Sequence, residues 1–272
     1  MKNQDIYIIN WLNACCLLIF IMILIGGATR LTQSGLSMVD WKPLMGIVPP
    51  LNDNQWNDSF EKYKNYPEYQ KINQFKNMSL SDYKTIFYWE YAHRMLGRII
   101  GLFFIIPFIV FYRKKYIDDK LKRQILLAIF LVVFQGLLGW FMVKSGLVDN
   151  PHVSHYRLAS HLLLAFLLIA YTYWIKLNIE KKEQYSSFNK SISIHINLIL
   201  ILYIVQVLFG AFIAGTKAGL LWNTFPLMDG KIIPDGLLVL NPFYMNFFDN
   251  MKMFQFCHRL LGTFIVIYSG WF

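Results

Sequence analysis

Charged residues are scarce in this sequence. Only 15% of its 272 residues are Asp, Glu, Lys or Arg, whereas 56% are hydrophobic and 17% are aromatic. The mean hydropathy is positive. Soluble domains usually carry about a quarter charged residues, so this composition argues against a soluble protein and favours one that resides in a membrane.

Cysteine is also scarce, and the N-terminus lacks the pattern of a removable targeting peptide. Cys15, Cys16 and Cys257 all fall in apolar stretches, so a disulfide in a loop outside the membrane is not available. The N-terminus has neither the charged region, apolar core and small-residue site of a cleavable signal nor an arginine-rich transit composition. We therefore expect the first apolar stretch to remain as a helix.

Long apolar runs, by contrast, are abundant. A bilayer core of about 30 Å is spanned by about 20 apolar residues in a helix. The sequence predicts six such spans, at residues 8–28, 86–112, 125–143, 158–177, 193–214 and 254–272. Each span should be helical, because open strand edges cannot be satisfied in lipid. We therefore predict an all-α polytopic membrane protein.

The net charge of +10 is concentrated in short connections between spans. Residues 113–123 hold six basic side chains. Basic residues also flank the connection after the fourth span, namely Lys176, Lys181, Lys182 and Lys190. Because short cytoplasmic loops are enriched in Lys and Arg, we expect a cytoplasmic N-terminus and no role in nucleic-acid binding. The connections expected outside are residues 29–85, 144–157 and 215–253.

Two stretches at the heads of spans recur along the chain. "HRMLG" (residues 93–97) opens the second span, and "HRLLG" (residues 258–262) opens the sixth. The segments after the first and fifth spans also correspond, through matches of Thr29-Arg30 to Thr216-Lys217, residues 34–36 to 218–220 and residues 43–45 to 226–228. This self-similarity places spans one and two opposite spans five and six, which predicts a repeating unit of four helices.

The repeat divides the chain into one complete unit and part of another. We predict an N-terminal four-helix bundle in residues 1–180 and the first half of a second bundle in residues 181–272. Residues 264–272 form an apolar run without a C-cap, a basic stop or a polar tail. We therefore expect a sequence truncated within the sixth span or at its end.

Three histidines are expected at a similar depth. His93, His161 and His258 lie a few residues into the second, fourth and sixth spans, roughly 5–10 Å from the outer ends of their helices. Histidines on facing helices of a bundle can hold a metal or a heme iron. His93 and His161 could ligate one heme from opposite sides, and His258 could ligate a second. The alternative is a set of hydrogen-bonded packing residues.

Two glycines and the three other histidines are interpreted separately. Gly97 and Gly101 share a helix face with His93 and leave room either for a flat macrocycle or for a close helix contact. His152 and His155 read as solvated loop residues, although His155 could cover a heme edge. His195 reads as an interfacial residue at the cytoplasmic end of its span.

Glu90 and a set of arginines place charge at the membrane boundary. Glu90 lies three residues before His93 and faces the same volume. A carboxylate there indicates function by default; it could orient an imidazole, accept protons or pair with an arginine that secures the helix end. The arginines could bind heme propionates or could snorkel to the interface; they are Arg30, Arg94 and Arg259.

Motifs along nearly the whole chain resemble those of one family. They are "GGATRLTQSGLSMVDWKPLMG" (residues 26–46), "EYAHRMLGR" (90–98), "QGLLGWFMVKSGL" (135–147), "HYRLASHL" (155–162), "NTFPLMDG" (223–230) and "FCHRLLGT" (256–263). In this order the motifs resemble the heme A synthase family, which serves cytochrome oxidase assembly in bacterial and mitochondrial inner membranes. The loop cysteine pair of one branch is missing, so the chain is similar to the other branch.

The resemblance implies a fold, an activity and a set of site residues. The fold would be two four-helix bundles, and the reaction would oxidise the C8 methyl of heme O to a formyl group through hydroxylated intermediates. Glu90 matches the family's essential glutamate, His93 and His161 the axial positions of the substrate heme, and His258 one ligand of a C-terminal heme b. Implied partners are heme O synthase, oxidase assembly factors and lipid, with a homo-oligomer possible. The expected location is a bacterial inner membrane in preference to a mitochondrial one.

Two other functions explain part of the same pattern. A diheme b-type cytochrome that only transfers electrons accounts for the histidines without needing Glu90. A transporter with charged residues inside the membrane accounts for Glu90 and the arginines but predicts no bound heme.

Overall fold

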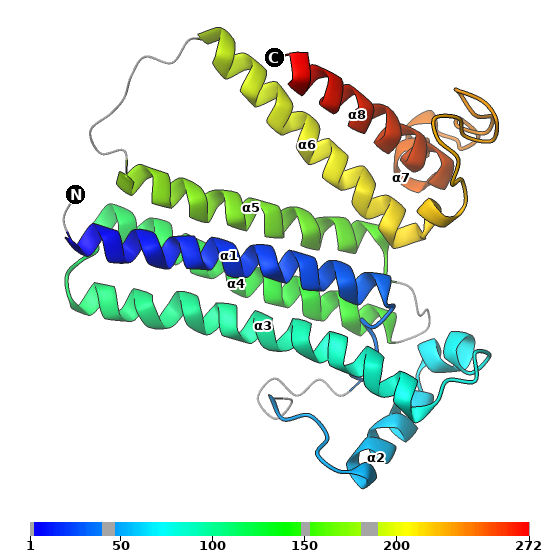
Figure 1. Ribbon diagram of the computed structural model, residues 1–272, viewed down its shortest axis with the longest axis horizontal. Helices are drawn as coiled ribbons and strands as arrows, with labels where there is room; N and C mark the ends of the chain where they lie inside the picture. Colours follow the sequence, from blue (N-terminus) through cyan, green and yellow to red (C-terminus); the bar gives the residue numbers. More distant parts are fainter. Residues whose placement is uncertain (1–2, 40–46, 148–152, 181–189, 272) are drawn as a thin grey trace. The chain divides into compact units, whose positions relative to one another are not determined.

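The computed structural model describes residues 3–39, 47–147, 153–180 and 190–271, which are mostly helical (Figure 1). The long helices are α1 (Asn3–Leu31), α3 (Leu80–Arg113), α4 (Asp119–Gly146), α5 (His155–Glu180), α6 (Lys190–Thr216) and α8 (Met251–Trp271). The short ones are α2 (Asp53–Lys64), the π-helix η2 (Tyr69–Asn73), the 3-10 helices η3 (Ala218–Leu220) and η4 (Phe243–Met245), and α7 (Asn246–Asp249). In these ranges the only β pairing is an isolated bridge between Met228 and Lys231. The predicted all-α fold is confirmed.

Five of the long helices can cross a membrane by length and composition. They are α1, α3, α4, α5 and α6. The sixth predicted span forms helix α8, of 21 residues, but α8 is not among the apolar spans found in the described part of the chain. Gln255, His258 and Arg259 reduce the hydropathy of its first half. The chain is therefore a multi-pass membrane protein with five apolar helices in the described residues, one fewer than predicted.

The chain folds as two compact units. Unit 1 comprises Met1–Val153 and Leu164–Gln184, and unit 2 comprises Ser154–Leu163 and Tyr185–Phe272. Helix α5 thus contributes its first residues to unit 2 and the rest to unit 1. The predicted domain boundary between residues 180 and 181 adjoins residues 181–189, which lie outside the described ranges, and it stays a prediction.

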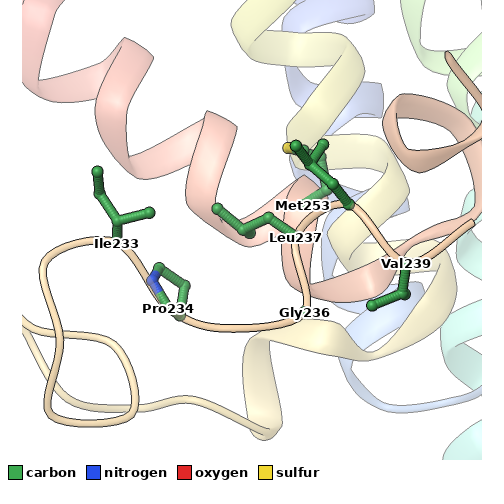
Figure 2. A pocket seen from close by; sticks show the side chains of 7 residues that line it. Ile233, Pro234, Gly236, Leu237, Val239 and Met253 are labelled. Carbon is green, nitrogen blue, oxygen red and sulfur yellow. The ribbon is translucent and has the colours of Figure 1, made fainter. Parts of the chain in front are cut away.

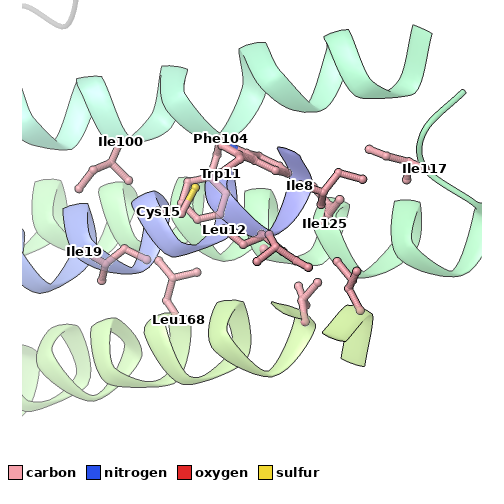
Figure 3. Packing of buried hydrophobic residues seen from close by; sticks show 14 residues of the cluster. Ile8, Trp11, Leu12, Cys15, Ile19, Ile100, Phe104, Ile117, Ile125 and Leu168 are labelled. Atoms are coloured by element: carbon pink, nitrogen blue, oxygen red, sulfur yellow. The ribbon is translucent and has the colours of Figure 1, made fainter. Parts of the chain in front are cut away.

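Helix α1 supplies the centre of unit 1. Its buried residues recur at the spacing of one helix face and pack between α3, α4 and the later part of α5 (Figure 3). The side chains labelled there include Ile8, Leu12, Cys15 and Ile19 of α1, Ile100 and Phe104 of α3, Ile125 of α4 and Leu168 of α5. Trp11 Nε1 also donates a hydrogen bond of 2.8 Å to Phe103 O. All three cysteines lie in helices and are free, as predicted.

A helical cap precedes α3 in unit 1. Ser79 and Asp82 form a capping box that starts α3 at Leu80, six residues before the predicted span. The first turns of α3 bury Tyr83 and Phe87 against aromatic residues of α2. His93 therefore lies about 20 Å from the start of its helix, and the prediction that it lies within 10 Å was wrong. The cause is the local cap, which extends the helix beyond its apolar run.

Unit 2 is built on the pairing of α6 with α8. A small cluster of Ala159, Ala211, Phe212 and Phe254 joins these helices to the start of α5. The connection between α6 and α8 is irregular apart from three short helices. Asn246, fully buried, holds this connection by hydrogen bonds with the backbone N and O of Leu240.

Candidate functional site

Glu90 is a buried carboxylate on α3. Its side chain is 2% exposed, and its oxygens accept three hydrogen bonds. Oε2 accepts from Ser37 Oγ at 2.7 Å and from Met38 N at 2.8 Å. Oε1 accepts from Arg94 Nη2 at 2.5 Å. A buried charge is stable only when it is paired and hydrogen-bonded, and Glu90 meets both conditions.

Arg94 and Ser37 extend this arrangement into the segment that follows α1. Arg94 Nη2 also donates to Met38 O at 3.0 Å. Ser37 Oγ lies within hydrogen-bond distance of Ser34 O and Ile86 O as well. The pairing of Glu90 with an arginine, one of the predicted roles, is thus present, and the two side chains fix the segment after α1 to α3. A catalytic role for Glu90 stays a prediction.

His93 packs against α1. A Cβ atom added at Gly26 of α1 would lie 3.2 Å from His93 Nε2, and one added at Gly97 would lie 3.3 Å from Met22 Cε. Gly97 therefore serves the close helix contact that was one of its two predicted roles. A Cβ at Gly101 would meet nothing within 4 Å, so space remains on that face one turn further along.

His258 repeats this arrangement in unit 2. A Cβ atom at Gly210 of α6 would lie 3.1 Å from His258 Cε1, and one at Gly262 would lie 3.0 Å from Gln206 Nε2. His258 Nδ1 lies 3.2 Å from Gln206 O, and its Nε2 lies 3.4 Å from Gln206 Nε2. The repeat seen in the sequence is therefore also a repeat of helix contacts. Gln206 of α6 takes the place that Met22 has in α1.

The arginines that follow the two histidines also act alike. Arg259 donates to Thr224 O at 2.5 Å and to Trp222 O, so it binds the segment after α6 as Arg94 binds the segment after α1. Gln255 donates to Trp222 O at 2.7 Å and is 5% exposed. It precedes His258 by three residues, as Glu90 precedes His93. Gln255 was missed in the sequence, although its spacing in the repeated motif could have identified it.

The remaining predicted site residues each have their own surroundings. His161 is half-buried in the part of α5 that belongs to unit 2, whereas His93 belongs to unit 1, so their joint ligation of a heme stays a prediction. Arg30 interacts electrostatically with Glu68, which is itself 7% exposed and accepts a hydrogen bond from Tyr63. Propionate binding by Arg30, Arg94 and Arg259 stays a prediction.

His155 was wrongly read as a solvated loop residue. Helix α5 begins at His155, whose Nε2 lies 2.8 Å from Phe248 O. Its ring packs against Phe212 and Phe254, and a Cβ at Gly215 would lie 2.5 Å from His155 Cβ. Contacts distant in sequence thus partly bury it within unit 2. His195 is hydrogen-bonded to Tyr268, and His152 lies outside the described residues.

The histidines fit axial ligation of heme better than a multi-ligand metal site. No group of three or more His, Cys, Asp or Glu residues able to hold a metal occurs in the described part of the chain, but heme iron needs only axial ligands from the protein. An Nδ1–H bond from His258 to Gln206 O would make Nε2, which lies 3.4 Å from Gln206 Nε2, the unprotonated nitrogen that a heme iron requires. Beside it, Gln206 Oε1 is buried without a hydrogen-bond partner among the described residues. These features fit a polar group bound next to His258.

The fold and this site define a class of protein: a multi-pass helical membrane protein with a repeated pair of helices, each pair carrying a half-buried histidine followed by an arginine. Residues 9–272 match the sequence model of the cytochrome oxidase assembly protein family, and the chain belongs to that family. The predicted resemblance is therefore confirmed.

Several relatives of the chain are named heme A synthase. The one from Nitrosospira multiformis is 50% identical over 260 residues, covering 94% of this chain and 72% of the relative. Those from Nitrosomonas eutropha and Flavobacterium psychrophilum are each 45% identical, covering 96% and 97% of this chain and 74% and 78% of the relatives. No solved structure matches the chain.

Proposed function

We propose that the protein is a heme A synthase, an oxidoreductase that converts the C8 methyl of heme O to a formyl group through hydroxylated intermediates. The product, heme A, would serve cytochrome c oxidase. The relatives named heme A synthase and the family membership support this assignment. The structural observation that carries it is the contrast between Glu90 and Gln255 at matching positions of the repeat.

The neutral Gln255 indicates what a charge at residue 90 is for. Both side chains bind the segment that follows the preceding helix, Glu90 through Ser37 and Met38 and Gln255 through Trp222. Holding that segment therefore does not require a carboxylate. Because burying a charge is costly even when it is paired and ionisable residues inside the membrane are usually functional, the carboxylate of Glu90 supports a role in the chemistry.

Glu90 lies one turn before His93, where the substrate heme O would be held by His93 with His161. Oxidation of a methyl group releases protons, and a carboxylate within the site can accept them or stabilise positive charge that develops at the porphyrin edge. Arg94 forms an ion pair of 2.5 Å with Glu90. Ser37 and Met38 N fix the direction of the carboxylate.

His258 would ligate a heme b in unit 2. When bound, that group would supply one-electron transfer away from the substrate. The protein contributes the orientation of the imidazole, through the carbonyl of Gln206 and the absence of a side chain at Gly210. The second axial ligand is not among the predicted site residues of this chain.

The proposed setting is a bacterial inner membrane with the N-terminus in the cytoplasm. Heme O has a long isoprenoid tail, so substrate and product would both reside in lipid and could exchange laterally with the helix bundle. Heme O synthase and oxidase assembly factors are the proposed partners.

Extraction of hemes from cells that express the protein with heme O synthase tests the proposal. Mass spectrometry should detect heme A with the wild type, and heme O or a hydroxylated heme with Glu90→Ala. A diheme electron-transfer cytochrome would instead bind heme and leave the available heme O unchanged in both strains. That result would overturn the proposed function.

A further inference from the structure

The connection between α6 and α8, residues 217–250, exposes an unusual amount of apolar surface. Eight of its large hydrophobic side chains are between 59% and 80% exposed. They are Leu220, Phe225, Ile232, Ile233, Leu238, Val239, Phe243 and Tyr244. Apolar patches of this kind on a protein mark contact with another molecule or with a membrane.

This exposure belongs to a well-anchored segment. Arg259 binds the carbonyls of Trp222 and Thr224, and Asn250 Nδ2 donates to Gly236 O at 2.9 Å. Met228 is 2% exposed and packs inward. The backbone is therefore held by specific bonds while the apolar side chains point outward, so the apolar surface is a feature of the fold.

The described part of the corresponding connection of unit 1 exposes fewer large apolar side chains, with Val48, Leu51 and Phe75 between 62% and 80% exposed. Helix α2 buries its aromatic residues Trp56, Phe60 and Tyr63 in a cluster with the start of α3. The exposed positions of α2 are polar, including the charged residues Asp58 and Glu61. The two connections therefore differ in how much of their apolar content points outward.

An apolar groove of about 400 Å³ lies within the same segment (Figure 2). Its walls include Ile233, Pro234, Leu237, Leu238, Val239 and Met253. Water in such a groove would find few hydrogen-bond partners, whereas a hydrocarbon chain would be well accommodated.

The position of the segment in the chain identifies the occupant. It starts directly after Thr216, the last residue of an apolar span, and Leu220 follows four residues later. At no more than about 3.6 Å per residue, Leu220 lies within about 14 Å of the end of that span. On α6 itself Ile201 and Ile204 are each 58% exposed, so exposed apolar side chains occur both before and after the end of that span.

We propose that residues 217–250 lie in the interfacial layer of the bilayer, with their exposed apolar side chains and the groove in contact with acyl chains of lipid. The connection of unit 1 would remain in water. This inference depends on the membrane-spanning helices and is independent of the reaction assigned above.

Site-directed spin labelling tests the proposal in vesicles of phosphatidylcholine and phosphatidylglycerol. Nitroxides would be attached at Phe225→Cys and Ile232→Cys, with Phe75→Cys as the control, because Phe75 is 80% exposed on the connection of unit 1. Cys15, Cys16 and Cys257 would be replaced by Ala in all three. Power saturation then compares collisions with oxygen, which concentrates in lipid, and with a water-soluble nickel chelate.

We expect oxygen accessibility to exceed nickel accessibility several-fold at residues 225 and 232, and the reverse at residue 75. High nickel accessibility at residues 225 and 232 would place the segment in water and overturn the proposal. Low accessibility to both reagents would show cover by protein, either a second copy or a partner, and would also overturn it.

The wild-type chain provides a second test if the labelled variants do not accumulate. Vesicles that contain a phosphatidylcholine with a photoreactive acyl chain should crosslink to peptides of residues 217–250 and not to peptides of residues 47–79. Absence of lipid adducts on residues 217–250, while the membrane-spanning helices are modified, would overturn the proposal.

Discussion

The α1–α3 and α6–α8 helix pairs make the same helix contacts and differ in the side chains beside their histidines. In each pair a histidine packs on a glycine of the partner helix, His93 on Gly26 and His258 on Gly210. In each pair the next residue, an arginine, binds carbonyls of the segment that follows the first helix. The shared features are those that the packing of two helices requires.

The differences lie at two positions beside the histidines. Unit 1 has the carboxylate of Glu90 where unit 2 has the amide of Gln255, and it has the thioether of Met22 where unit 2 has the amide of Gln206. Unit 1 therefore places a negative charge near its histidine, and unit 2 places neutral dipoles. This comparison teaches that the same helix contacts form with either set of side chains and that the negative charge is specific to unit 1.

The largest expected effect comes from removing each histidine. His93→Ala should abolish heme A formation, because the substrate would lose an axial ligand, whereas His258→Ala should remove the heme of unit 2. Difference spectra of the purified variants and extracted heme content measure both. Equal heme content in both variants and the wild type would contradict ligation by these residues.

The next largest effect should come from removing the arginines, and the loss of folding free energy should differ between the two units. Arg94→Ala leaves Glu90 buried without its ion pair, which should cost about 3–5 kcal/mol of folding free energy. Arg259→Ala removes the donor to Thr224 O, while Trp222 O keeps the bond from Gln255 Nε2, so the loss should be about 1 kcal/mol. Denaturation in detergent at neutral pH compares them, and an equal loss would show that the charge of Glu90 adds nothing. In Arg94→Ala, the further change Glu90→Gln should restore part of the loss.

The glycines should show what the two pairs have in common. Gly26→Ala and Gly210→Ala would each push a Cβ to within 3.2 Å of an imidazole, so both should shift the ring and cost about 1–3 kcal/mol as overpacking. Gly101→Ala is the control, since its Cβ would meet nothing within 4 Å. Thermal unfolding and the heme absorption spectrum of each variant measure the effect. A shift only in Gly101→Ala would refute the close contact.

The smallest expected effect is a loss of folding stability at alkaline pH, and it arises at Tyr63 in α2 of unit 1. Burial and the charge of Glu68 raise the pKa of Tyr63 well above its usual value of 10.0. A raised pKa in the folded chain contributes stability below the unfolded pKa that is lost as the pH rises above it, so stability should fall above about pH 10. Tyr63→Phe should weaken that dependence while losing two hydrogen bonds. Urea titrations at pH 8 and above test this, and an unchanged slope would contradict it.

The sequence predicted the helices well because hydropathy and bilayer thickness determine them directly. The motif with Glu90, His93 and Arg94 was also visible, since charged groups inside an apolar run are conspicuous. The start of α3 was missed because Ser79 and Asp82 cap a helix that extends beyond its apolar part. His155 was misread because its contact with Phe248 joins residues 93 positions apart, which no local pattern reveals.

The central claim is that the charge of Glu90 serves chemistry while its hydrogen bonds serve structure. The most direct test is Glu90→Gln, which gives unit 1 the side chain that unit 2 has at residue 255, with Gln255→Ala as the control. Extracted hemes should show wild-type heme content and no heme A in Glu90→Gln, and retained heme A in Gln255→Ala. Full heme A formation by Glu90→Gln would contradict the claim, as would a loss of bound heme, which would make Glu90 a structural residue.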